Sequence, residues 1–157
     1  PPFCRCILVL VMFCGGCAGS TAGGVKVSRV VLLVKGVRRD MRRIMHSREV
    51  RPITLDGQRV SEETLSSVSV FFFAYIAILL FGTLVVSLDG VEFTAAFTAS
   101  LTAISNVGPG LGALGPTCNF GFLSNLSKLV LTLMMLLGRL EIMPLLVLMM
   151  PSVWRRK

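Results

Sequence analysis

Four long apolar runs dominate the pattern of hydrophobic and polar positions along the chain. They cover residues 6–25, 65–88, 93–127 and 129 onward, and the last is broken only by Arg139 and Glu141. A membrane-spanning helix needs about 20 apolar residues, a length that residues 65–88 provide. Ser61 precedes two acidic residues, which predicts a helix N-cap followed by charges that favour the positive end of the helix dipole. The pattern therefore predicts a spanning helix that begins near residue 61.

The third run changes composition halfway along. Residues 93–104 are rich in Ala, Thr and Phe, whereas residues 108–116 are rich in Gly and Pro, which end a helix. A helix over residues 93–104 would be about 18 Å long at about 1.5 Å per residue, too short for a hydrocarbon core of about 30 Å. We therefore expect it to enter the membrane and turn back. Asp89 and Glu92 just before it have the spacing of a capping box, with Asp89 as the cap.

The last run predicts a long helix over residues 125–154 that ends in Trp154 and three bases, an arrangement typical of an interfacial anchor. Ten of the sixteen Lys and Arg residues lie between Lys26 and Arg59. We interpret this segment as a basic cytoplasmic loop, with a small hairpin at the Asp56-Gly57 turn. Because basic loops stay inside, this segment is predicted on the cytoplasmic side. With the apolar runs on either side of it, the chain is predicted to be a multi-pass protein of the cell (inner) membrane.

Composition narrows the class of protein. The chain has 157 residues, 54% of them hydrophobic and 15% charged, with a mean hydropathy of +0.79, which excludes an ordinary soluble domain. The formal net charge of +8 is regional and flanked by apolar runs, so no nucleic-acid partner is expected. The chain begins without Met, and we expect it to be part of a longer protein. No catalytic constellation is recognisable, which favours a protein that is not an enzyme.

The segment Ser105-Asn106-Val107-Gly108-Pro109 directly follows the predicted short helix. Non-helical backbone at membrane depth is tolerated only where protein buries it or where it lines a watery cavity. The negative end of a helix, followed by extended backbone with a glycine, can present carbonyl oxygens to a dehydrated cation. This pattern indicates a selectivity filter that binds a cation at Asn106 and Val107. An ordinary external loop is the open alternative.

Five glycines occupy ten residues between Gly15 and Gly24, inside an apolar run. Gly15, Gly19 and Gly23 form two GxxxG steps, which usually indicate tight helix packing, but so many glycines favour an unwound segment. We predict a flexible gating loop that contains Gly15, Gly16, Gly19, Ser20, Thr21, Gly23 and Gly24. A phosphate-binding loop does not fit, because Val25 occupies the position of the required lysine. A membrane redox or metal enzyme that uses Cys14 and Cys17 stays open as a further alternative.

Arg139 lies within the last apolar run. An arginine near the bilayer centre costs about 2.5 to 3.5 kcal/mol on insertion scales, so it normally faces protein or water. Glu141 cannot pair with it along the helix, because residues two apart point in different directions. We predict that Arg139 acts below the filter, as an electrostatic barrier or as a brace for the glycine loop.

Three strings, at residues 12–26, 105–112 and 138–141, closely resemble the Trk/Ktr/HKT superfamily of potassium transporters. The resemblance is greatest to the C-terminal part of its bacterial Trk uptake subunits. It implies an all-α membrane protein of four helix–pore loop–helix repeats around one pore. This chain would hold the end of the third repeat and all of the fourth. The implied units are residues 1–34, an inner helix with the glycine loop; 35–60, the basic loop; and 61–157, the fourth repeat.

The resemblance also implies the substrate and the partners. Potassium would be the transported substrate, and no organic cofactor is implied for this chain. The implied partners are the rest of the transporter polypeptide with three further repeats, a second copy in a homodimer, and a cytoplasmic nucleotide-binding regulatory subunit of the TrkA/KtrA type. Anionic membrane lipid is the rival partner for the basic segment. The alternative function is a structural membrane scaffold subunit with glycine-mediated helix packing.

Overall fold

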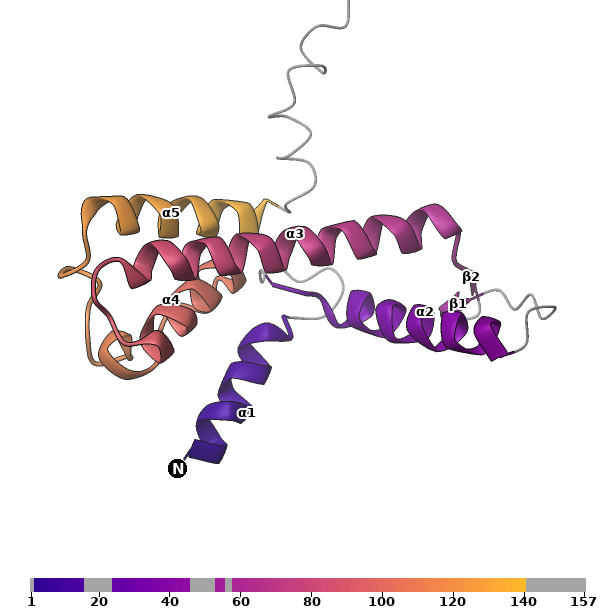
Figure 1. Ribbon diagram of the computed structural model, residues 1–157, viewed down its shortest axis with the longest axis horizontal. Coiled ribbons are helices and arrows are strands. Elements are labelled where there is room, and N and C mark those ends of the chain that lie inside the picture. The colour runs from indigo at the N-terminus through magenta and orange to yellow at the C-terminus, as the bar shows by residue number, and fades with distance from the viewer. Residues whose placement is uncertain (1, 16–23, 46–52, 56–57, 141–157) are drawn as a thin grey trace, which may run out of the picture.

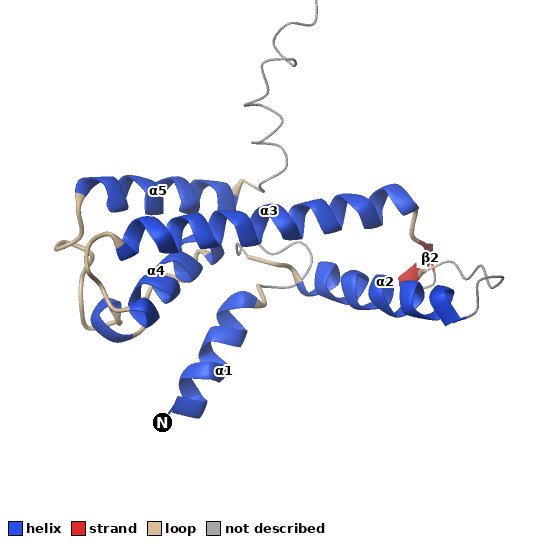
Figure 2. Ribbon diagram, in the orientation of Figure 1, coloured by secondary structure: helices blue, strands red, loops and turns tan. Residues whose placement is uncertain are grey.

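The computed structural model describes residues 2–15, 24–45, 53–55 and 58–140, and within them the fold is almost entirely helical (Figure 2). The described part contains helices α1 (Pro2–Phe13), α2 (Val27–Met45), α3 (Glu62–Ser87), α4 (Phe93–Ser105) and α5 (Asn125–Arg139), the short 3-10 helix η1 (Gly112–Leu114), and strands β1 (Thr54–Leu55) and β2 (Gln58–Arg59). The predicted all-α class is confirmed at this level.

The predicted long apolar helix is confirmed as α3, of 26 residues. Its N-cap is Ser61, whose hydroxyl accepts a hydrogen bond from the Thr64 N–H at 3.2 Å. Within the described residues, α3 is the one helix long and apolar enough to cross a membrane. At about 1.5 Å per residue it extends about 39 Å, more than the roughly 30 Å of a hydrocarbon core.

The two halves of α3 pack against different partners (Figure 1). The C-terminal half contacts α4 and α5, and around it lies the larger apolar core, which includes Leu79, Val86, Leu101 and Leu131. The N-terminal half packs against α2 around a smaller core of Leu32, Ile53, Leu65 and Val68. The ends of α4 and α5 and the start of α2 therefore meet near the middle of α3.

The basic segment differs from the expectation of a loop, because residues 27–45 form helix α2. The change follows from its amphipathic pattern: Leu32 is buried against α3, while Lys35, Arg38 and Arg42 are exposed. Arg39 pairs with Glu62 in the first turn of α3, and the Lys35 Nζ donates to the Thr54 carbonyl at 2.8 Å. The predicted hairpin is confirmed, with Thr54 opposite Arg59.

The predicted short helix is confirmed as α4, but the predicted capping box is wrong. The N-cap is Glu92, and no side chain caps the helix. Asp89 instead belongs to the turn that ends α3, where its carboxylate accepts a hydrogen bond from the Ser124 N–H at 3.0 Å. Ser124 is in turn the N-cap of α5. Asp89 therefore ties the end of α3 to the start of α5.

Helix α5 begins at Asn125, as predicted, and its described part ends at Arg139. The predicted continuation to Trp154, with Glu141, lies outside the described residues. Helix α1 ends at Phe13, and an isolated bridge pairs Cys14 with Val25. A continuous helix through the glycines is therefore excluded at both ends of the segment.

Asp89 gives the chain a pH-dependent contact. The Ser124 N–H, aided by the hydroxyls of Ser127 and Ser124, lowers the pKa of Asp89 below its ordinary 3.8. A lowered pKa stabilises the fold above the ordinary value, and this stabilisation is lost as the pH falls through the folded-state pKa.

We expect Asp89→Asn in the complete transporter to be less heat-stable than the wild type at pH 6. The difference should shrink below about pH 4, as measured by the loss of monodisperse protein on heating.

The Asn side chain keeps an oxygen acceptor, so the variant removes the charge and preserves the shape of the turn. A stability difference that stays constant from pH 6 to pH 3 would contradict this role of the carboxylate.

Candidate functional site

The predicted filter segment begins where α4 ends, beside the middle of α3 (Figure 1). Asn106 is the C-cap of α4 and has a left-handed backbone, with φ 54° and ψ 41°. Its N–H donates to the Ala103 carbonyl, and the Val107 N–H donates to the Thr102 carbonyl at 3.1 Å. Asparagine tolerates this conformation better than most residues, so α4 ends sharply and the chain leaves it in a new direction.

Beyond Asn106, residues 107–110 belong to neither a helix nor a strand. Gly108 has φ 112°, a conformation that favours glycine, and a β-carbon there would meet nothing within 4 Å. Glycine is therefore required by the backbone conformation and not by crowding. The side chain of Val107 is half exposed, and Pro109 is exposed as well.

The return of the chain is tied back onto α4. The Leu111 N–H donates to the Thr98 hydroxyl at 3.0 Å, and the Gly110 N–H donates to the Leu114 carbonyl at 2.9 Å. Among the hydrogen bonds of the described residues, none is accepted by a main-chain carbonyl of residues 105–109. The segment is thus held at both ends, and its carbonyl oxygens are left for another partner.

The two ends of the glycine segment lie next to the same point. The Gly15 N–H donates to the Val25 carbonyl at 3.0 Å, and Gly24 has φ +84°. A β-carbon on Gly24 would lie 3.1 Å from the Ser105 hydroxyl and 3.5 Å from the Gly15 Cα. The structure therefore brings Gly15 and Gly24 to the end of α4. The predicted loop residues Gly16, Gly19, Ser20, Thr21 and Gly23 lie outside the described residues.

Helix α5 approaches the end of α4 through Gly138. A β-carbon on Gly138 would collide with the Ile104 carbonyl oxygen and would lie 2.8 Å from the Asn106 amide nitrogen. That amide donates to the Met135 carbonyl at 3.2 Å. Arg139 follows Gly138 directly and ends the described helix with its side chain exposed. The predicted position of Arg139 below the filter and its role both stay predictions.

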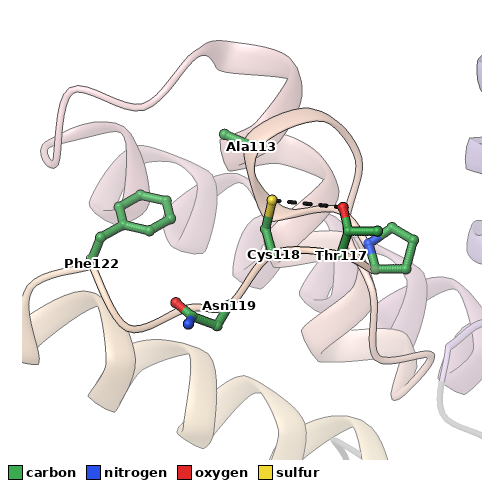
Figure 3. A pocket seen from close by; sticks show the side chains of 6 residues that line it. Ala113, Thr117, Cys118, Asn119 and Phe122 are labelled. Atoms are coloured by element: carbon green, nitrogen blue, oxygen red, sulfur yellow. Dashed lines mark hydrogen bonds between the residues drawn. The ribbon is translucent and has the colours of Figure 1, made fainter.

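An open hollow of about 440 Å³ lies in the loop after η1 (Figure 3). It is lined by Ala113, Pro116, Thr117, Cys118, Asn119 and Phe122. Its lining carries no charged side chain. Within the part of the chain that the structure describes, no group of three or more His, Cys, Asp or Glu residues could hold a metal ion.

Sequence reasoning missed two residues of this site. The sequence pattern distinguishes neither Gly138, which is only part of the string 138–141, nor Tyr75, the single tyrosine of the chain. Tyr75 is 1% exposed, and its hydroxyl shares a hydrogen bond of 3.0 Å with the Ser105 hydroxyl. A lone polar aromatic residue in an otherwise apolar stretch was the available signal, because a buried Tyr hydroxyl normally has a partner.

Comparison with known proteins identifies the family. A family model described as "TrkH: Cation transport protein" matches residues 1–156. The Trk system potassium uptake protein TrkH of Salmonella typhimurium is 39% identical over 155 residues, which are 99% of this chain and 32% of that protein. The Trk system potassium uptake protein TrkI of Halomonas elongata is 40% identical over 148 residues, 92% of this chain and 30% of its own length.

A solved structure agrees with these matches. The crystal structure of the potassium transporter TrkH from Vibrio parahaemolyticus superimposes with a TM-score of 0.87 at 38% identity, covering 99% of this chain and 33% of that one. The chain therefore belongs to the TrkH family of cation transport proteins, and its relatives are transporters rather than enzymes. It spans about a third of the length of the relatives that it matches.

The approach of α5 to α4 can be tested at Gly138. We expect Gly138→Ala in the complete transporter to destabilise the fold by about 1 to 3 kcal/mol, because the added carbon meets rigid backbone. The measurement is the midpoint of heat denaturation of the purified protein.

Gly36→Ala is the matched control, since Gly36 is also helical but a β-carbon there would meet only the flexible Leu65 side chain, at 3.3 Å. It should be neutral or stabilising, because Ala favours a helix. Equal midpoints for the two variants would refute the close packing at Gly138.

Proposed function

We propose that this chain supplies one quarter of a potassium-conducting pore, which takes up the ion by replacing its water shell with main-chain oxygens. The observation that carries the proposal is the segment 105–109. It leaves the end of α4 through a left-handed Asn106 and a positive-φ Gly108, and its carbonyls accept no hydrogen bond from any described residue. Such carbonyls are suited to coordinating a dehydrated cation, with potassium at Asn106 and Val107.

The proposal assigns each element a place in a helix–pore loop–helix repeat. Helix α3 is the outer helix, α4 the pore helix and α5 the inner helix of the fourth repeat, while α1 ends the third. The length of α4 supports this assignment, because 13 residues extend about 20 Å and cannot span a membrane. Its negative dipole end lies at Ser105, where it favours a cation.

The glycine segment is proposed to be the gate. Its described end Gly24 lies beside Gly15 and beside Ser105, the last residue of α4, since a β-carbon on Gly24 would lie within 3.5 Å of both, so a change in the segment would act next to the proposed filter. Arg139 is proposed as the electrostatic barrier or brace beside it. An arginine one residue from the contact between Gly138 and Ile104 is well placed for that role.

The proposed setting is a multi-pass protein of the cell (inner) membrane. The exposed bases on α2, together with the pair that joins Arg39 of α2 to Glu62 of α3, support a cytoplasmic position for the N-terminal end of α3. The relatives' lengths support three further repeats in the same polypeptide. The other proposed partners are a second copy and a nucleotide-binding regulatory subunit of the TrkA/KtrA type at α2. Anionic lipid is the rival for α2, where an apolar groove of about 580 Å³ is lined in part by Arg38 and Phe73.

A structural scaffold without an ion pathway is the second candidate, because Gly138 and Gly82 do pack helices closely. Under that function Gly23→Ala should impair assembly and leave rubidium flux per assembled protein unchanged. The open surroundings of Gly108 favour the pore instead, since glycine has no packing role there.

Gly108→Asp tests the proposed function in the complete transporter. We expect the variant to insert and assemble normally but to lose potassium uptake, because the side chain strains the segment and adds charge among the coordinating oxygens. Uptake is measured as rubidium flux into proteoliposomes, normalised to assembled protein.

Gly90→Asp is the control, since Gly90 also has a positive φ, 70°, and open space around it, but lies in the turn after α3. It should retain flux. Unchanged flux with Gly108→Asp would count decisively against the filter.

A further inference from the structure

The side chain of Tyr75 contacts both the last residue of α4 and the last residue of α1. Its hydroxyl shares a 3.0 Å hydrogen bond with the hydroxyl of Ser105, the first residue of the filter segment 105–109. Its ring packs edge-on against Phe13, the last residue of α1, with the ring centroids 5.5 Å apart. Phe13 is in turn one residue before the strand-like pair that closes the glycine segment.

Burial makes these contacts persistent. Tyr75 is 1% exposed and Ser105 is 2% exposed, so water does not compete for their hydrogen bond. Gly24 approaches the same hydroxyl of Ser105, where a β-carbon would lie 3.1 Å away. The end of α4 therefore lies beside Gly24 and is linked to the end of α1 through Tyr75 and Phe13.

From this geometry we infer that Tyr75 is a positioning residue that couples the end of α1 to the start of the filter segment and thereby sets ion preference. The inference rests on the proposed function. The hydroxyl holds the side chain of Ser105, the last residue of α4, next to the left-handed Asn106 that sets the direction in which the backbone leaves the helix. A filter selects between ions through the placement of its oxygens, so loosening this anchor weakens discrimination before it weakens conduction.

The test removes the hydroxyl and keeps the ring. In proteoliposomes of the complete transporter, Tyr75→Phe should raise the ratio of sodium to rubidium flux by about two- to tenfold, the range that corresponds to the net contribution of one hydrogen bond. Assembly should be unchanged, because the packing on Phe13 is preserved. Ser105→Ala should give the same change, and the double variant should change the ratio no further, since both remove the same bond.

Thr83→Val is the matched control. Thr83 is a buried hydroxyl on the same helix, bonded only to the Leu79 carbonyl of its own helix, and it lies outside the junction. Its loss should leave the flux ratio at the wild-type value.

The outcomes separate the two proposals. A wild-type flux ratio in Tyr75→Phe, with flux abolished in Gly108→Asp, would overturn the coupling and leave the pore intact. Additive effects of Tyr75→Phe and Ser105→Ala would also overturn it, because they would show that the two hydroxyls act separately. Unchanged flux in Gly108→Asp would remove the proposed function itself.

Discussion

The arrangement depends on a helix that stops inside the protein. Helix α4 ends at Ser105, surrounded by apolar side chains, and a helix end leaves carbonyl and amide groups that need partners. Part of this need is met locally, by the bonds from Asn106 and Val107 to the last turn. The rest requires neighbours to approach the backbone itself, and side chains larger than hydrogen would prevent that approach.

Two glycines satisfy this requirement from opposite directions. Gly138 brings α5 against the Ile104 carbonyl, and Gly24 brings the glycine segment against the Ser105 hydroxyl. The Asn106 amide then reaches the Met135 carbonyl. Tyr75 of α3 also contacts the end of α4, through its hydrogen bond to Ser105. The end of α4 is therefore enclosed by α3, by α5 and by Gly24, which precedes α2. The glycines thus serve the close approach of backbone, which is a different role from the open, positive-φ Gly108.

The sequence predicted what depends on local pattern. The 26-residue α3, its Ser61 cap and the short α4 follow from apolar run length, capping chemistry and the Gly/Pro stretch. The capping box at Asp89 failed because the carboxylate binds Ser124, 35 residues along the chain, and spacing alone carries no information about such a partner. The basic segment became helix α2 for a similar reason: tertiary contact through Leu32 and Arg39 decides it. Gly138 and Tyr75 were missed because their roles exist only once α3, α4 and α5 are packed.

Under the proposed function, the packing gives a physical reason why ion preference would depend on residues that never touch the ion. Beyond Asn106 the filter segment is exposed from Val107 to Pro109, and nothing lies within 4 Å of a β-carbon at Gly108. A segment with so little lateral support takes its geometry from its ends, and those ends are Ser105, held by Tyr75, and Leu111, held by Thr98. Coordinating oxygens stabilise a dehydrated ion only when they are already in place, since reorganising them costs free energy that the ion must supply. The positions of the carbonyl oxygens in the filter segment must therefore be set by the helix ends that hold it. A displacement of Ser105 would then also displace the carbonyls that follow it.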